Sequence, residues 1–175
     1  MSSITLVPIT GDVRLARLLA SAASCGWRGR TDLERIARRC EWPPRLRASV
    51  AKLPDRQLAA LVRASHTIWR VFASPADRAG TLRGLIGQPR LCLDDAEPPR
   101  LACRAESAGR ALTLTAALGL ADILATHGDG SLDVCAQRYC TQPVLRIGRN
   151  SRSTACSPEC ANRARVARHR AKRQT

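Results

Sequence analysis

Four cysteines near the C-terminus are the residues of this chain best suited to chemistry. Cys135, Cys140, Cys156 and Cys160 follow the pattern C-x4-C-x15-C-x3-C. Two short pairs of thiolates are typical ligands of a tetrahedral zinc ion, and the long connection between them lets the pairs meet. Because protein fills all four positions, such an ion is structural. The pattern predicts one structural Zn²⁺ per chain; buried free thiols and an iron–sulfur cluster are the alternatives.

A basic segment follows the last cysteine. Ser157 and Pro158 are typical of a helix start, so we expect a helix from there towards the C-terminus. Asn162 and Arg163 can each make two hydrogen bonds to a purine, or can instead brace the finger beside Cys160. The predicted nucleic-acid-binding residues are Asn162, Arg163, Arg165, Arg168, Arg170, Lys172 and Arg173. A solvated, frayed end is the alternative for this tail.

The charge of the chain is concentrated in this C-terminal part. The 175 residues carry a net charge of +15, and residues 135–175 hold ten basic residues and one acid. A genome rich in G and C would raise the arginine content everywhere, whereas the asymmetry singles out one segment. Such a basic segment favours a polyanionic partner, and nucleic acid is the default candidate.

The residues around the second cysteine pair resemble a known family. Cys160-Ala161-Asn162-Arg163, followed by regularly spaced basic residues, is similar to the CGNR-type zinc finger of bacterial proteins, with Ala161 in place of the glycine. The resemblance implies a DNA-binding module behind a helical N-terminal domain of the ABATE type, which is proposed to be regulatory. It is specific over residues 108–175 and only architectural over residues 1–107.

Three positions depart from that family pattern. The family usually carries an aromatic residue near Val144, an acid near Arg146, and a tryptophan where this chain has Ala155. The metal ligands are unaffected, but weaker bracing of the finger is expected.

The elements that position the finger are predicted to be mainly helical. Apolar spacing and caps predict helices over 12–24, 31–42, 45–53, 55–73, 74–87 and 107–126, the last apolar on all sides and hence central. The segments 90–95 and 100–105 predict a two-stranded hairpin. We expect a fold that is mainly α with a small β-hairpin: a helical ABATE-like domain over 1–130, then a zinc-finger module over 131–175. The glycines of 127–130 predict a flexible joint.

Other features exclude several functional classes. The longest run without charge, 111–121, is too short to span a bilayer, and the start lacks a secretory signal pattern. We therefore expect a cytoplasmic protein with reduced thiols and no membrane partner. No phosphate-binding loop or catalytic triad motif occurs, so we expect no catalytic residues and no enzyme. The three tryptophans and the four other cysteines (Cys25, Cys40, Cys92 and Cys103) are interpreted as core residues.

Together these features predict a transcriptional regulator. Its zinc finger binds double-stranded DNA at the nucleoid, and its N-terminal domain senses an unidentified effector or forms a homodimer. A protein-interaction adaptor for an acidic partner such as the transcription machinery is the alternative. RNA binding is a variant that the shortage of aromatic residues in the finger disfavours.

Overall fold

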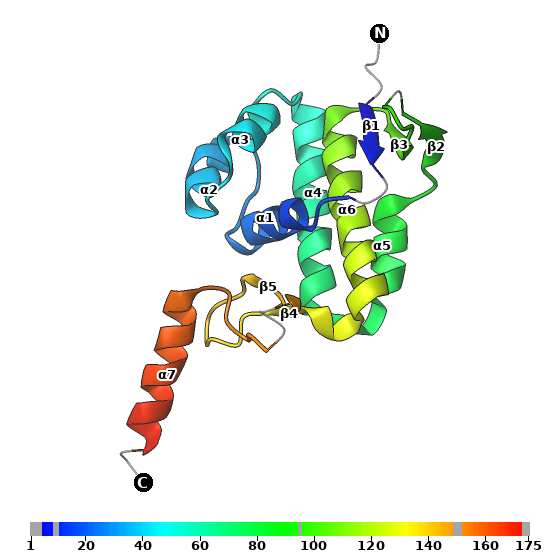
Figure 1. The fold of residues 1–175 in the computed structure, drawn as a ribbon. Helices are drawn as coiled ribbons and strands as arrows, with labels where there is room; N and C mark the ends of the chain where they lie inside the picture. The colour runs from blue at the N-terminus through cyan, green and yellow to red at the C-terminus, as the bar shows by residue number, and fades with distance from the viewer. Residues whose placement is uncertain (1–4, 9–10, 95, 149–151, 173–175) are drawn as a thin grey trace.

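The computed structural model describes residues 5–8, 11–94, 96–148 and 152–172 (Figure 1). The predicted fold class is confirmed, because helices dominate and the strands form two small antiparallel sheets. The helices of the described residues are α1 (Val13–Ser24), α2 (Leu33–Arg39), α3 (Pro44–Ala51), α4 (Asp55–Ala73), α5 (Arg78–Ile86), α6 (Ala108–His127) and α7 (Pro158–Lys172). The strands are β1 (Thr5–Pro8), β2 (Arg90–Leu93), β3 (Leu101–Ala105), β4 (Leu132–Val134) and β5 (Pro143–Leu145).

Helices α4 and α6 form the centre of the molecule and lie side by side (Figure 1). Helix α1 packs across both, and α5 packs against α6. As predicted, α6 is the central helix, with Leu114, Ala117 and Leu120 almost fully buried. Helix α6 is also the described helix whose length and apolar composition would suit a membrane span. Here these apolar residues are instead packed against other helices of the protein.

The start of α1 approaches α6 at backbone distance. Asp12 caps α1 by accepting the N–H groups of Arg14 and Leu15, and its own N–H donates to Thr115 O at 2.8 Å. A Cβ atom at Gly119 would lie 2.5 Å from the Asp12 backbone. Only glycine at this position allows the two helices to pack so closely.

The predicted hairpin is part of a larger sheet. Strands β2 and β3 pair antiparallel as expected, with Cys92 opposite Ala102. Strand β1 adds to the free edge of β3, with Val7 opposite Cys103, so the order is β1-β3-β2. No local pattern predicted β1, because this strand is short and its pairing partner lies almost 100 residues away along the chain.

Two of the helices predicted from caps, over 31–42 and 74–87, do not begin at their predicted caps, Thr31 and Ser74. Thr31 lies in a 3₁₀ turn (Arg30–Asp32) instead of capping a helix, because the Arg30 guanidinium holds this turn against the Ala51 carbonyl and Asp55. Helix α5 is capped by Asp77, which accepts the Gly80 N–H, and not by Ser74. Pro75 begins a separate 3₁₀ turn there, which moves the helix start by three residues.

The segment around the predicted boundary at 130/131 is fixed by a buried arginine. Arg78, at the start of α5, is 6% exposed. Its guanidinium donates to the Val71 and Phe72 carbonyls at the end of α4 and to the Asp129 and Leu132 carbonyls. Leu132, the first residue of β4, belongs to the same apolar core as α1, α4 and α6. The finger therefore begins inside the core of the helical domain.

Candidate metal centre

The first cysteine pair lies on the turn that joins β4 to β5. These strands pair antiparallel, with Asp133 opposite Val144. Beyond the ladder, Cys135 N–H donates to Gln142 O at 2.9 Å and Cys140 N–H donates to Gln137 O at 2.9 Å. The chain reverses at Tyr139, which has a φ of 66°. This turn points Cys135 and Cys140 to the same side of the hairpin.

The second pair lies at the start of α7. The predicted cap is confirmed, because α7 begins at Pro158 and Ser157 Oγ accepts the Cys160 N–H at 3.3 Å. Cys156 precedes the helix and Cys160 lies in its first turn. A backbone hydrogen bond of 2.8 Å from Ala136 N–H to Thr154 O links the segment before Cys156 to the turn between β4 and β5.

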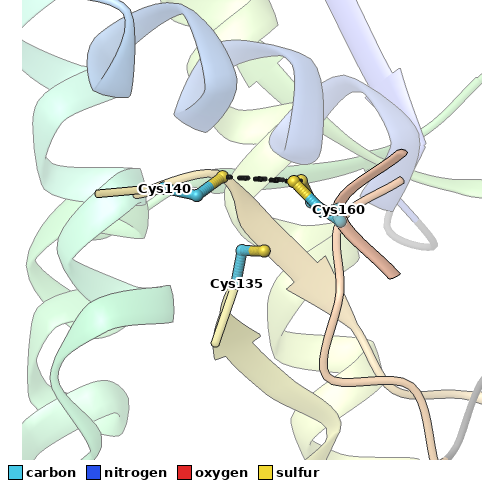
Figure 2. Close-up of side chains that lie close together, drawn as sticks. Cys135, Cys140 and Cys160 are labelled. Atoms are coloured by element: carbon cyan, nitrogen blue, oxygen red, sulfur yellow. Dashed lines mark hydrogen bonds between the residues drawn. The ribbon is translucent and has the colours of Figure 1, made fainter. Parts of the chain in front are cut away.

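The four sulfur atoms form one compact cluster. All lie within 4.8 Å of one another, and Figure 2 shows the sulfurs of Cys140 and Cys160 joined above Cys135. The Sγ–Sγ distances are 3.6 Å for Cys140–Cys156, 3.6 Å for Cys156–Cys160 and 3.9 Å for Cys140–Cys160. A regular tetrahedron with Zn–S bonds of about 2.3 Å has edges of about 3.8 Å. The cluster therefore fits one four-coordinate zinc ion.

Spacing, fold and sulfur geometry all point to one kind of finger. Residues 131–173 match the CGNR zinc finger family. No curated protein matches the chain. The match covers the module predicted from the cysteines, so the resemblance of this part of the chain is confirmed.

The thiols of the CGNR finger differ in how easily they ionise. Burial opposes ionisation of Cys135, but N–H groups at Gln137 and Cys156 and the Cys140 and Cys156 thiols point to its sulfur, so its pKa is lowered overall. Burial raises the pKa of Cys140 and, with the neighbouring sulfurs, that of Cys156. Four thiolates so close together repel one another unless a cation lies between them, so the site needs a positive ion to hold its ionised form.

Two residues predicted to contact bases are engaged within the finger. Arg163 Nη2 lies 3.5 Å from the Cys160 sulfur, as a donor to a metal ligand would. Asn162 Oδ1 accepts a hydrogen bond of 2.8 Å from Arg165 Nη2. Arg168 and Arg170 are exposed further along α7, which ends at Lys172. Arg173 lies outside the described residues.

The three departures from the family pattern have visible consequences. Val144 and Ala155 line a groove of about 380 Å³ between the finger and Arg17 of α1. Large aromatic side chains at these positions would fill that space. Arg146, which replaces an acid, pairs with Asp133 across the hairpin at 3.3 Å. An ion pair therefore braces the hairpin of this finger at that position.

Contacts that dock the finger on the helical domain were not predicted. Trp69 of α4 donates its indole N–H to Thr141 O at 2.9 Å. Gln142 Nε2 donates to Ser24 Oγ at 2.7 Å and lies 3.2 Å from Cys25 Sγ at the end of α1. Trp27 and Trp42 are core residues as expected, whereas Trp69 is only half-buried. Partial exposure of an aromatic residue on an amphipathic helix is a tertiary property, so the sequence carried no signal for it.

Proposed function

We propose that the CGNR finger binds double-stranded DNA through α7 and that the protein is a transcriptional regulator. The observation that carries the proposal is the state of α7, which projects away from the body of the protein (Figure 1). From Ala161 to Arg170, every residue except the half-buried Ala164 is exposed. A helix with so little packing and so much positive charge needs a partner outside the protein, and an α-helix fits the major groove of DNA.

The two sides of α7 have different tasks in this proposal. Cys160 and Ala164 are four residues apart and face the zinc cluster, which agrees with their burial. Asn162, Val166 and His169 are spaced by four and three residues and therefore share the opposite face. This outer face would meet the base edges: an amide and an imidazole can bond to purines, and Val166, which is 40% exposed, can contact a thymine methyl group.

The arginines flank this outer face. Arg165 and Arg168 lie on one side of it and Arg163 and Arg170 on the other, as 3.6 residues per turn dictates. A helix in a groove has phosphates on both sides, so this distribution suits backbone contacts along both edges. Arg163 has a second task because it also braces Cys160.

The remaining parts of the proposal concern the zinc ion, the helical domain and the location of the protein. The zinc ion holds the finger in shape and takes no part in a reaction, and the protein is not an enzyme. The helical domain, to which the finger is docked, senses an effector or forms the homodimer contact. The protein acts on the nucleoid in the cytoplasm.

DNA binding is tested with two variants of equal charge. The first replaces Arg165, Arg168 and Arg170 by glutamine; the control replaces Arg56, Arg63 and Arg83, which are exposed on α4 and α5. Each phosphate contact contributes about 0.9 to the slope of log affinity against log salt concentration. The slope of the first variant should therefore be shallower by about 2.7. At about 0.15 M salt that corresponds to roughly 100-fold weaker binding.

Fluorescence anisotropy with labelled random-sequence duplex DNA measures both quantities on the full-length zinc-loaded protein. The control variant should bind nearly as tightly as the original protein, because its arginines lie away from α7. Equal losses in the two variants would show that net charge alone drives binding and would refute the role of α7. Absence of DNA affinity in the unmodified protein would instead favour the adaptor function.

A further inference from the structure

The helical domain holds a second pair of cysteines outside the metal centre. Cys25 ends α1 and Cys40 ends α2, and both are half-buried. The two thiols are close enough for each to shift the pKa of the other. Both side chains pack against the main apolar core and neither belongs to the zinc cluster.

Two equivalent helix ends bring these thiols together. In α1, Gly26 N–H donates to Ala23 O and Trp27 N–H to Ala22 O; in α2, Glu41 N–H donates to Arg38 O and Trp42 N–H to Ala37 O. Both ends are therefore Schellman motifs, with cysteine at the C-cap and tryptophan two residues later. The sequence repeats this arrangement as Cys25-Gly26-Trp27 and Cys40-Glu41-Trp42.

The tryptophans lock the two motifs against each other. The Trp27 and Trp42 rings meet edge to face, with centroids 5.3 Å apart and planes at 90°. Both side chains are buried. Glu41 adopts a φ of 52° to complete its motif, a conformation that costs energy for any residue except glycine. The packing of the two tryptophans thus places Cys25 beside Cys40 through a rigid scaffold.

We propose that Cys25 and Cys40 are a dithiol site that a peroxide oxidises to a reversible disulfide. Cys25 first releases its proton to the solvent; its thiolate then attacks one peroxide oxygen, so that an S–O bond forms and the O–O bond breaks, and the departing hydroxide takes up a proton from the solvent and becomes water. Cys40 then gives up its proton and attacks the Cys25 sulfur; an S–S bond forms and the S–O bond breaks, releasing a second water. Two thiols lose two electrons in total, and the peroxide accepts them.

The surroundings assign Cys25 as the attacking sulfur. The hydrogen bond with Cys40 lowers the pKa of Cys25 to about 6, against the effect of burial, with further help from Gln142 and the Arg39 charge. The pKa of Cys40 is raised by the same hydrogen bond and by burial, which leaves Cys40 as the protonated partner. A lower pKa increases the thiolate fraction but reduces its nucleophilicity, so Cys25 should react roughly two- to fourfold faster than an ordinary thiol.

The site adjoins the CGNR finger. Gln142 Nε2 lies 3.2 Å from Cys25 Sγ, and the carbonyl of the same residue accepts the Cys135 N–H. One residue of the finger therefore contacts the reactive thiol and a metal-bearing turn. The proposal does not depend on DNA binding.

The experiment treats the full-length zinc-loaded protein with limiting hydrogen peroxide. Samples are alkylated under denaturing conditions and digested with trypsin without reduction, while a chromogenic chelator follows the release of zinc. The expected product joins peptides 18–28 and 40–45, has lost two hydrogens, and forms before zinc is released. Dithiothreitol should separate the peptides again.

The chain supplies its own control pair. Cys92 and Cys103 lie on neighbouring strands one register position apart, so their side chains point to opposite faces of the sheet. No link between them is expected. In Cys40→Ser, Cys25 should accumulate as a sulfenic acid that dimedone traps. Zinc release without the 18–28/40–45 link, or equal alkylation of Cys25 before and after peroxide, would overturn the proposal.

Discussion

Arg78 offers a test of how the finger and the helical domain are joined. Its guanidinium donates to the Val71 and Phe72 carbonyls at the end of α4 and to the Leu132 carbonyl at the start of β4, at 2.7, 3.2 and 2.8 Å. All three contacts are buried. Arg78→Met keeps the length of the aliphatic stem and removes every donor.

The cost of Arg78→Met follows from the groups that are left behind. The last carbonyls of a helix have no partner within the helix, so Val71 and Phe72 depend on an outside donor. A buried acceptor without a partner costs about 1–3 kcal/mol. Part of the total is offset, because the variant no longer has to bury the charged guanidinium away from water. We expect a loss of about 3–5 kcal/mol, which lowers Tm by roughly 6–20 °C for a chain of this size.

Urea and thermal unfolding of the zinc-loaded protein, followed by circular dichroism, measure this loss. Arg83→Met is the matched control, because Arg83 lies on the same helix but is exposed; its effect should stay within about 0.5 kcal/mol. Arg78→Lys should fall between the two, since an ammonium group cannot span all the carbonyls. A loss below about 1 kcal/mol in Arg78→Met would refute the reasoning.

Three further predictions concern the metal and the helical domain. Elemental analysis should find about one zinc per chain, and Cys156→Ser should lose it because three ligands leave the tetrahedron open; full retention would contradict the site. Glu41→Gly should stabilise the protein by about 0.5–1 kcal/mol by relieving a φ of 52°, while Gly26→Ala at the equivalent position should cost about 1 kcal/mol. If urea unfolding shows that both variants change the free energy of unfolding in the same direction, the equivalence of the two helix ends is refuted. Residues 1–126 should give a helical spectrum and a cooperative melt without metal, but the missing Leu132 side chain should cost about 1.5–3 kcal/mol; an unfolded fragment would show that the two parts need one shared core.

Features that depend on neighbouring residues could be predicted from the sequence. The apolar spacing of 55–73 predicted α4 with its observed bounds, because one turn of helix decides which side chains share a face. The spacing of Cys135, Cys140, Cys156 and Cys160 predicted the zinc site, since the chemistry needs only two short pairs and a connection between them. The start of α7 at Pro158 also followed from local capping.

Features that depend on contacts between distant segments were decided by the tertiary structure. Strand β1 exists only because β3 offers it a free edge, and Arg78 is buried only because α4 and β4 end at the same place. Likewise, nothing in the sequence distinguishes Cys25 and Cys40 from other cysteines of a core, and the contact between Trp27 and Trp42 brings them together. The local pattern sets which backbone groups and side chains need partners, but only packing sets which partner meets each one. For this reason the sequence determined the helices and the metal ligands, and the tertiary structure determined how the finger is held and where the second thiol pair lies.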